Sequence, residues 1–291
     1  MDKIRTGSTF SLLNADYVQL NKNWNYRNVI SPFYRLYLVD EGEGKLSSPV
    51  NNHALGTGNL YLIPSFTVCN YSCPEYLSLY YLHIMEESPK GDSLFASCSG
   101  ILKIPAYGDD ERYFRRILQL NPDRGLRRTT DPKVYEKNAT IQGFRDLNNK
   151  SPLHVVMETE GIILQMLSRF LTAEDFQLKQ PANIPAKILE VVRFIQRNLH
   201  LPMTVTNLAQ RANQHPDYFS RLFQEYTGDR PLHYVQSKRI ERAQFLLITS
   251  DLSISGIAAE TGFDSISYFS RTFKKFSGQT PGEYKKQNLL I

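Results

Sequence analysis

The C-terminal third of the chain contains an internal repeat, and this repeat restricts the possible folds more than any other feature. The run Tyr-Phe-Ser-Arg-x-Phe occupies residues 218–223 and recurs at residues 268–273. The same three residues follow each run at the same spacing, namely Gly228, Pro231 and Tyr234 in the first copy and Gly278, Pro281 and Tyr284 in the second. Such self-similarity indicates that one supersecondary unit has been used twice.

Each copy predicts a short helix, a tight turn and a second helix. Thr204 and Ser253 are suitable N-caps for the first helices, because a hydroxyl oxygen can accept from the free backbone N–H groups there. Asn213 and Gly262 occupy the two turns, and these residue types tolerate a left-handed backbone best. Residues 231–250 carry apolar side chains at helical spacing, so we expect one helix to join the copies.

The second helix of each copy is expected to be amphipathic. Pro216 suits the first turn of the first of these helices, and Asp264 is the expected N-cap of the other. Their apolar faces comprise Phe219, Leu222, Phe223 and Tyr226 in one copy and Phe269, Phe273 and Phe276 in the other. Their opposite faces hold Asp217, Ser220, Arg221 and Gln224 in one copy and Ser267, Ser270, Arg271 and Lys274 in the other. Together with Tyr218, Tyr268 and Lys275, these are the candidate DNA-contact residues. A helix with an apolar inner face and such a polar outer face fits the major groove.

Two arginines at matching places, Arg221 and Arg271, are the strongest of these candidates. A single surface arginine is usually only solvated, but its repetition at equivalent positions favours contact with nucleic acid. Arginine binds guanine edges as well as phosphates, and the sequence leaves both roles open. Lys274 and Lys275 are expected on phosphates, where they would fix the register.

The distribution of charge supports the same assignment. Residues 1–183 hold 20 basic and 20 acidic side chains, whereas residues 184–291 hold 14 and 9, so the whole excess of +5 lies in the second segment. A neutral domain joined to a basic one is typical of proteins that bind nucleic acid. A purely protein-binding scaffold is the alternative, but it gives no reason for the basic excess to follow the repeat.

In these motifs, residues 184–288 resemble the AraC/XylS family of transcription regulators. The resemblance is carried by the second-copy run 254–275 with Gly278, Pro281 and Tyr284, and by Arg239, Ile240, Ala243, Leu246 and Leu247 in the linking helix. The first copy departs from the family pattern at Asn213, His215, Gln224 and Glu225. The resemblance implies sequence-specific binding of double-stranded DNA, and contact with RNA polymerase in the case of an activator. It also implies an N-terminal cupin-like β-barrel that binds a small effector, a sugar or metabolite, followed by dimerising helices.

The expected fold class is therefore α+β. Residues 1–172 would form the cupin-like effector-binding and dimerisation domain, 173–183 a linker, and 184–291 an all-α domain of two helix-turn-helix units joined by a central helix. Short strands are expected between about 29 and 105, including 34–39, 60–63 and 76–85, and helices over 110–120, 132–147 and 152–171. The apolar stripe predicted on the last of these helices comprises Leu153, Val156, Ile163, Leu164, Leu167 and Leu171. This stripe could form a dimer seam or pack against the barrel.

The candidate effector-binding residues are Trp24, Tyr37, Tyr61, Tyr81 and His83. Each of the aromatic residues could instead belong to the barrel core, which is the commoner role. A metal-dependent enzyme would need clustered ligands, yet this region has only His53 and His83 among its histidines, so no metal, cofactor or catalytic residue is expected.

The remaining features favour a cytoplasmic protein. Three cysteines at irregular spacing, Cys69, Cys73 and Cys98, argue against a disulfide framework and fit a reducing compartment. The first residues lack the apolar segment of a signal peptide, and no stretch is long and apolar enough for a membrane helix.

Overall fold

The computed structural model of the chain describes residues 9–48, 51–87, 94–95, 100–126, 131, 138–172 and 185–287. Their packing divides the chain into an N-terminal unit that extends to Gln180 and a C-terminal unit that extends from Pro181 to Ile291. The expected linker 173–183 and Cys98 lie outside the described residues.

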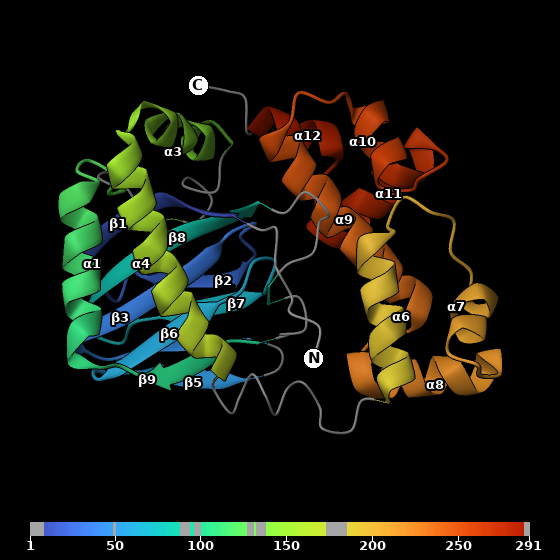
Figure 1. Ribbon diagram of the computed structural model, residues 1–291, viewed down its shortest axis with the longest axis horizontal. Coiled ribbons are helices and arrows are strands. Elements are labelled where there is room, and N and C mark those ends of the chain that lie inside the picture. Colours follow the sequence, from blue (N-terminus) through green and yellow to red (C-terminus); the bar gives the residue numbers. More distant parts are fainter. Residues whose placement is uncertain are drawn as a thin grey trace. The chain divides into compact units, whose positions relative to one another are not determined.

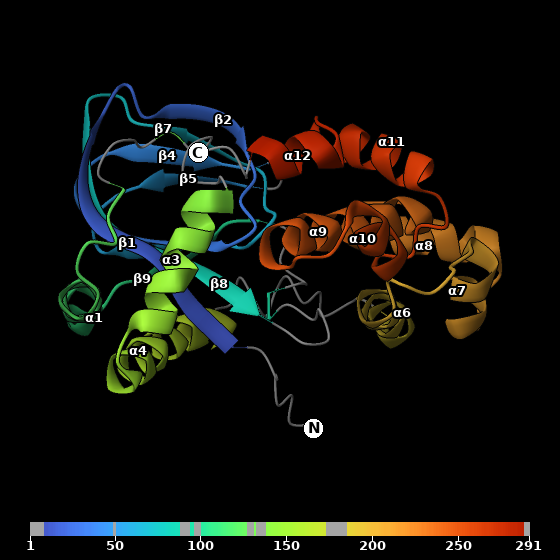
Figure 2. The same ribbon diagram turned by 90° about the horizontal axis from the view of Figure 1, so that it is seen from above.

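The N-terminal unit is built on two antiparallel sheets. The first has the strand order β1-β8-β3-β6-β9 and the second the order β2-β7-β4-β5. The strands are β1 (Thr9–Asn21), β2 (Asn25–Val29), β3 (Tyr34–Gly42), β4 (Gly44–Ser47), β5 (Asn52–Leu55), β6 (Asn59–Ile63), β7 (Cys69–Ser72), β8 (Tyr76–Glu87) and β9 (Leu102–Pro105). In Figure 2 the four-stranded sheet forms one layer of the unit and the five-stranded sheet the next.

Both faces of the five-stranded sheet are buried, because successive side chains of a strand point to opposite faces. On one face, Leu36, Leu60 and Leu82 belong to a cluster shared with the helices. On the other face lies the inter-sheet interior, an apolar cluster to which both sheets contribute. Its members are Leu20, Trp24, Val29, Tyr37, Val39, Leu46, Leu55, Tyr61, Ile63, Cys69, Tyr71, Cys73, Leu77, Leu79, Tyr81 and Ile101.

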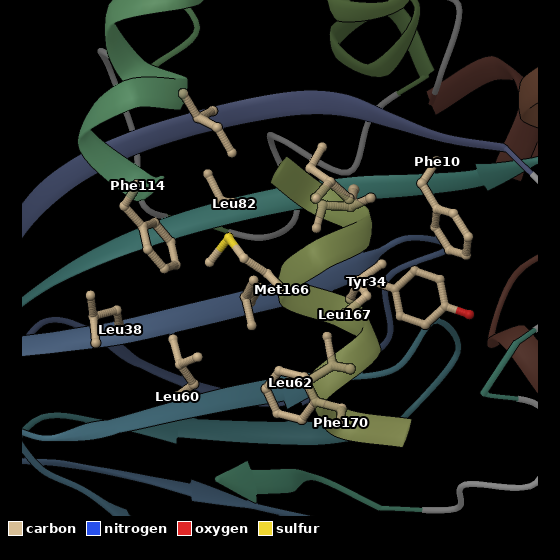
Figure 3. Close-up of a cluster of buried hydrophobic side chains, with 14 of the residues drawn as sticks. Phe10, Tyr34, Leu38, Leu60, Leu62, Leu82, Phe114, Met166, Leu167 and Phe170 are labelled. Atoms are coloured by element: carbon tan, nitrogen blue, oxygen red, sulfur yellow. The ribbon is translucent and has the colours of Figure 1, made fainter. Parts of the chain in front are cut away.

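Helices cover the outer face of the five-stranded sheet (Figure 1). They are α1 (Gly108–Leu120), α3 (Asn138–Lys150) and α4 (Leu153–Thr172). Met166, Leu167 and Phe170 of α4 and Phe114 of α1 point onto the leucines of the sheet (Figure 3). Burial of each such side chain contributes roughly 1.5–3 kcal/mol. An ion pair between Arg169 and the buried carboxylate of Asp110 ties α4 to the start of α1.

All the regular secondary structure in the described part of the C-terminal unit is helical. Its helices are α6 (Ala186–Arg197), α7 (Val205–Arg211), α8 (Pro216–Thr227), α9 (Pro231–Thr249), α10 (Ile254–Glu260), α11 (Ile266–Ser277) and α12 (Pro281–Gln287). The unit has two apolar cores, and α9 contributes to both, with Val235 in the first and Ile240, Ala243, Leu246 and Leu247 in the second. The single linking helix expected between the repeats is thus confirmed.

The mixed α+β class and the strands expected near 34–39, 60–63 and 76–85 are confirmed. Strands β1 and β2, which begin before residue 29, were not predicted. The structure divides the apolar stripe predicted on α4, because Ile163 and Leu167 are buried whereas Leu153 and Leu164 are exposed. Thr159, Met166 and Phe170 lie on the buried face in place of the two exposed leucines.

Candidate functional site

The first helices of the two repeat copies begin in the same way. The hydroxyl oxygen of Thr204 accepts a hydrogen bond of 3.1 Å from the backbone N–H of Asn207, and that of Ser253 accepts one of 3.1 Å from Gly256. Both predicted N-caps are therefore confirmed. The cap occupies one of the free N–H groups of each helix, which is worth about 1 kcal/mol.

The same backbone motif ends both first helices. Asn213 and Gly262 have positive φ angles of 50° and 77°, as their positions in the turns predict. Each donates its N–H to the carbonyl three residues back, and the residue after each donates to the carbonyl five residues back, which is a Schellman motif. The second copy then needs one residue more before its next helix, since α8 begins at Pro216 and α11 at Ile266. Ser265 rather than Asp264 is consequently the N-cap of α11, and the prediction of Asp264 is wrong.

Helices α8 and α11 are held by equivalent aromatic contacts. Phe219 and Phe223 are fully buried in the first copy, as are Phe269 and Phe273 in the second. The Phe223 ring meets Tyr234 edge-on at 5.5 Å and 76°, and the Phe273 ring meets Tyr284 at 5.3 Å and 75°. Both helices end on a left-handed glycine. The repeat therefore fixes α8 and α11 in their units by the same packing.

The outer faces of these two helices carry the sequence-predicted DNA-contact residues. Asp217, Tyr218, Arg221 and Gln224 on α8 are exposed, as are Ser267, Tyr268, Arg271, Lys274 and Lys275 on α11, whereas Ser220 and Ser270 are half-buried. Each helix thus presents a continuous polar surface opposite its aromatic face. A helix held in this way can enter a major groove while its inner face remains in the core.

The two polar surfaces differ in charge. Helix α8 carries one cation, Arg221, and two carboxylates, Asp217 and Glu225, which sum to −1. Helix α11 carries Arg271, Lys274 and Lys275 and no carboxylate, which sums to +3. Phosphate attraction at these surfaces is therefore concentrated on α11.

The structure brings all five effector candidates to the inter-sheet interior. Trp24, Tyr37, Tyr61 and Tyr81 belong to the inter-sheet cluster, and the ring of His83 lies 4.9 Å from that of Tyr81. All five side chains are at least 93% buried. The placement suits a binding site and a core equally, because aromatic rings serve both.

One polar side chain that the sequence analysis missed lies in the same interior. Arg35 is completely buried in β3, where its guanidinium donates to the hydroxyl of Tyr71 and, at 2.9 Å, to the carbonyl of Thr67. The alternation of β3 could have revealed it, since Arg35, Tyr37 and Val39 share one face of the strand.

Burial also sets the titration of the groups around Arg35. The pKa of His83 lies well below its usual range, because burial disfavours the imidazolium ion and the Arg35 charge repels it. Burial raises the pKa of the Cys69 thiol to about 11 and raises the pKa of the Tyr81 hydroxyl as well. These groups are therefore uncharged near neutral pH, and Arg35 supplies the positive charge of this region.

The residues that the structure describes contain neither a metal-binding cluster nor a membrane-spanning helix. No group of three or more His, Cys, Asp or Glu side chains could hold a metal ion there. None of the helices is long and apolar enough to span a membrane.

The chain is similar to known proteins, and the matched family model lies within the C-terminal unit. A family model described as a helix-turn-helix domain matches residues 208–287. The Msm operon regulatory protein of Streptococcus mutans serotype c is 22% identical over 273 residues, which are 92% of this chain and 89% of that protein. The uncharacterised HTH-type transcriptional regulator YfiF of Bacillus subtilis is 34% identical over 156 residues, which cover 53% of this chain and 49% of that protein.

Among solved structures, the DNA-binding domain of AdpA in complex with a target DNA is similar to part of this chain. It is 34% identical, and the match covers 34% of this chain and 90% of that domain with a TM-score of 0.34. AdpA is a global transcriptional factor.

Proposed function

From its C-terminal domain, which is an AraC-type helix-turn-helix domain, we infer that this chain is a sequence-specific DNA-binding transcription regulator. The observation that carries this inference is the duplicated unit itself. Helices α8 and α11 are anchored by the same aromatic contacts and expose polar faces at equivalent positions. Two such helices on one rigid frame suit two successive major-groove segments on one face of the duplex.

In this proposal the exposed residues divide into two roles. Arg221, Gln224 and Arg271 reach base edges, where arginine pairs with guanine and glutamine with adenine. Ser267, Lys274 and Lys275 bind phosphates and fix the register. Asp217, Tyr218, Ser220, Tyr268 and Ser270 complete the proposed contact surfaces.

We assign the N-terminal part to effector control. Its division from the DNA-binding part would follow the expected boundaries, with 1–172 as the effector domain, 173–183 as the linker and 184–291 as the DNA-binding domain. Two facing sheets around an aromatic interior support the cupin-like interpretation of the first part. Trp24, Tyr37, Tyr61, Tyr81 and His83 would line the site of a small metabolite or sugar.

The remaining partners follow from this role. The outer side of α4 exposes Leu153, Met157 and Leu164, which makes it our candidate surface for a homodimer. As an activator the bound protein would contact RNA polymerase, and as a regulator of bacterial genes it would act in the cytoplasm. In this role it would have no catalytic activity.

The test is selection of tight binders from a random duplex library with the full chain. The expected result is a two-part motif with halves about ten base pairs apart. The double variant Arg221→Ala, Arg271→Ala should select no motif. The matched control is Arg112→Ala, which removes an exposed arginine of α1 and should select the same motif as the natural chain. Recovery of no motif by the natural chain, with weak binding that vanishes in salt, would overturn the proposal.

A further inference from the structure

Within the C-terminal unit, the first helix-turn-helix unit (α6–α8) and the second (α10–α12) are called the first and second units below. The turn of the second, at Gly262, lies directly against the first. A Cβ atom built on Gly262 would stand only 2.3 Å from the carbonyl oxygen of Leu199, in the segment between α6 and α7. Leu199 itself packs on the first core. The two units therefore touch through their own backbones in addition to sharing α9.

Arg239 contacts both the segment between α6 and α7 and the turn that follows α10. It stands in α9 between the residues buried in the first core and those buried in the second. Its guanidinium donates to the carbonyl of Leu199 at 2.9 Å and to that of Leu201 at 2.7 Å. The same group lies over the ring of Phe263, at 5.7 Å from the ring centre, and Phe263 is buried in the second core. One planar cation thus links the first unit, the linking helix and the second turn.

The first copy has no such requirement at the equivalent turn. Asn213 has the same left-handed backbone as Gly262, but its side chain is exposed to solvent. Asparagine is tolerated there because only the backbone angle matters. At position 262 the Leu199 carbonyl and Arg239 occupy the space of a side chain, so glycine is needed for the close approach as well.

The part of α9 that belongs to the first unit is also attached along α11. Gln236 donates to the hydroxyl of Tyr268 at 2.6 Å, near the start of α11. The ring of His233 lies 5.1 Å from that of Phe276, near its end. Both residues flank Val235, which is buried in the first core. Movement of α11 relative to α8 would break these contacts together with those of Arg239.

We propose that Arg239 and Gly262 form an inter-unit joint that holds α8 and α11 at one separation and so sets the spacing of the two DNA half-sites. This inference rests on the proposed function for its biological meaning. One inserted base pair moves a half-site by about 3.4 Å along the duplex and by about 35° around it. A rigid joint cannot follow that displacement, so binding depends sharply on spacing.

The DNA test varies the number of base pairs between the two halves of the selected motif. The full chain should lose at least about tenfold in affinity on insertion of one base pair. Arg239→Ala should lose less than about threefold. Arg239→Gln, which keeps the three-carbon stem but removes the guanidinium, is the second variant if the alanine variant does not fold. The matched control is Arg242→Ala, also in α9, whose guanidinium lies over Phe245 within the second unit. A natural chain that tolerates the insertion, or an Arg239→Ala chain as sensitive as the natural one, would overturn the joint.

A second measurement tests the joint without DNA. Spin labels are attached at Glu225→Cys and Lys275→Cys, which are exposed matching positions on α8 and α11. Cys98 is replaced by alanine, and Cys69 and Cys73 are buried, so the labels react only at the two new cysteines. Pulsed electron paramagnetic resonance measures the distance between the two labels. The distribution of this distance should be narrow for this chain and for its Arg242→Ala variant, and about twice as wide for Arg239→Ala. Equal widths would refute the joint. Failure of the DNA selection alone would instead count against the proposed function.

Discussion

The side-chain amide of Gln236 in α9 donates a hydrogen bond of 2.6 Å to the hydroxyl oxygen of Tyr268 in α11. Tyr218, the equivalent residue of α8, is exposed to a similar degree, 48% against 43%. We expect Tyr268→Phe to lower the free energy of unfolding by about 0.5–1.5 kcal/mol, the usual value of one such bond. Tyr218→Phe should change it by less than about 0.5 kcal/mol. Urea unfolding of both variants measures the difference, and equal losses would show that the Gln236 bond does not form in solution.

Gly262 and Gly278 offer a matched pair of glycine substitutions. Both have positive φ, 77° and 81°, but only Gly262 has neighbours where a Cβ would lie. Gly278→Ala should cost about 1–2 kcal/mol for the left-handed backbone alone. Gly262→Ala should cost about 1–3 kcal/mol more, because the methyl group meets the Leu199 carbonyl. Equal destabilisation in urea titrations would mean that the close approach is absent.

The cations of α11 are expected to differ in how they affect DNA binding. Lys274→Gln and Lys275→Gln should each reduce the slope of log affinity against log salt by about 1 and weaken all sequences alike. Arg271→Ala should cost about 1–3 kcal/mol on the selected motif and far less on unrelated DNA. Lys187→Gln, an exposed lysine of α6, is the control that leaves both quantities unchanged. An equal loss on every sequence would place Arg271 on the phosphate backbone.

His83 should make the stability of the N-terminal unit depend on pH. Its pKa is depressed in the folded state by burial and by the Arg35 charge, whereas the unfolded chain takes up a proton near pH 6.5. Above that pH both states carry neutral His83, and it contributes nothing to the dependence. Below it the unfolded state binds more protons, so the free energy of unfolding falls as pH falls.

The natural chain should lose up to about 1.4 kcal/mol per pH unit below 6.5 relative to His83→Gln. Unfolding in urea at pH 7, 6 and 5 gives this comparison. Parallel curves for the two proteins would show that His83 is protonated in the folded state or exposed.

Cys69 is expected to be unreactive while the chain is folded. Burial raises the pKa of its thiol to about 11, so almost none is thiolate at pH 8. Alkylation followed by mass spectrometry of the Cys69 peptide should show modification only after denaturation. Rapid labelling of the native chain would contradict the buried position.

Local sequence signals were sufficient for most of the C-terminal unit. Caps, turns and aromatic spacing act over a few residues, and the repeat supplies two observations of each. The exception is the N-cap of α11, where the extra residue in the turn puts Ser265 in the place expected for Asp264. Arg239 stayed unrecognised as a link, because the Leu199 and Leu201 carbonyls are 40 and 38 residues away in the chain.

The N-terminal unit was harder to predict because its elements depend on distant partners. Strand β1 contains Asn14 and Asp16, which interrupt an apolar pattern, and it is held by pairing with β8 along its length. The apolar arc of α4 predicted a helix correctly, but periodicity does not say which part of a wide arc meets the sheet. The structure divides that arc, because Ile163 and Leu167 are buried whereas Leu153 and Leu164 are exposed.

Because α8 and α11 differ in charge, a single chain bound to DNA has one defined orientation along the duplex. The duplicated unit kept its aromatic interior, while one outer face came to carry −1 and the other +3. Two unlike faces cannot exchange places on a duplex, so the site of one chain has distinguishable ends. Reversal of such a site relative to a gene would exchange which unit stands nearer the start of transcription. Polarity along the chromosome would then be a property of one polypeptide, without the need for a partner to define it.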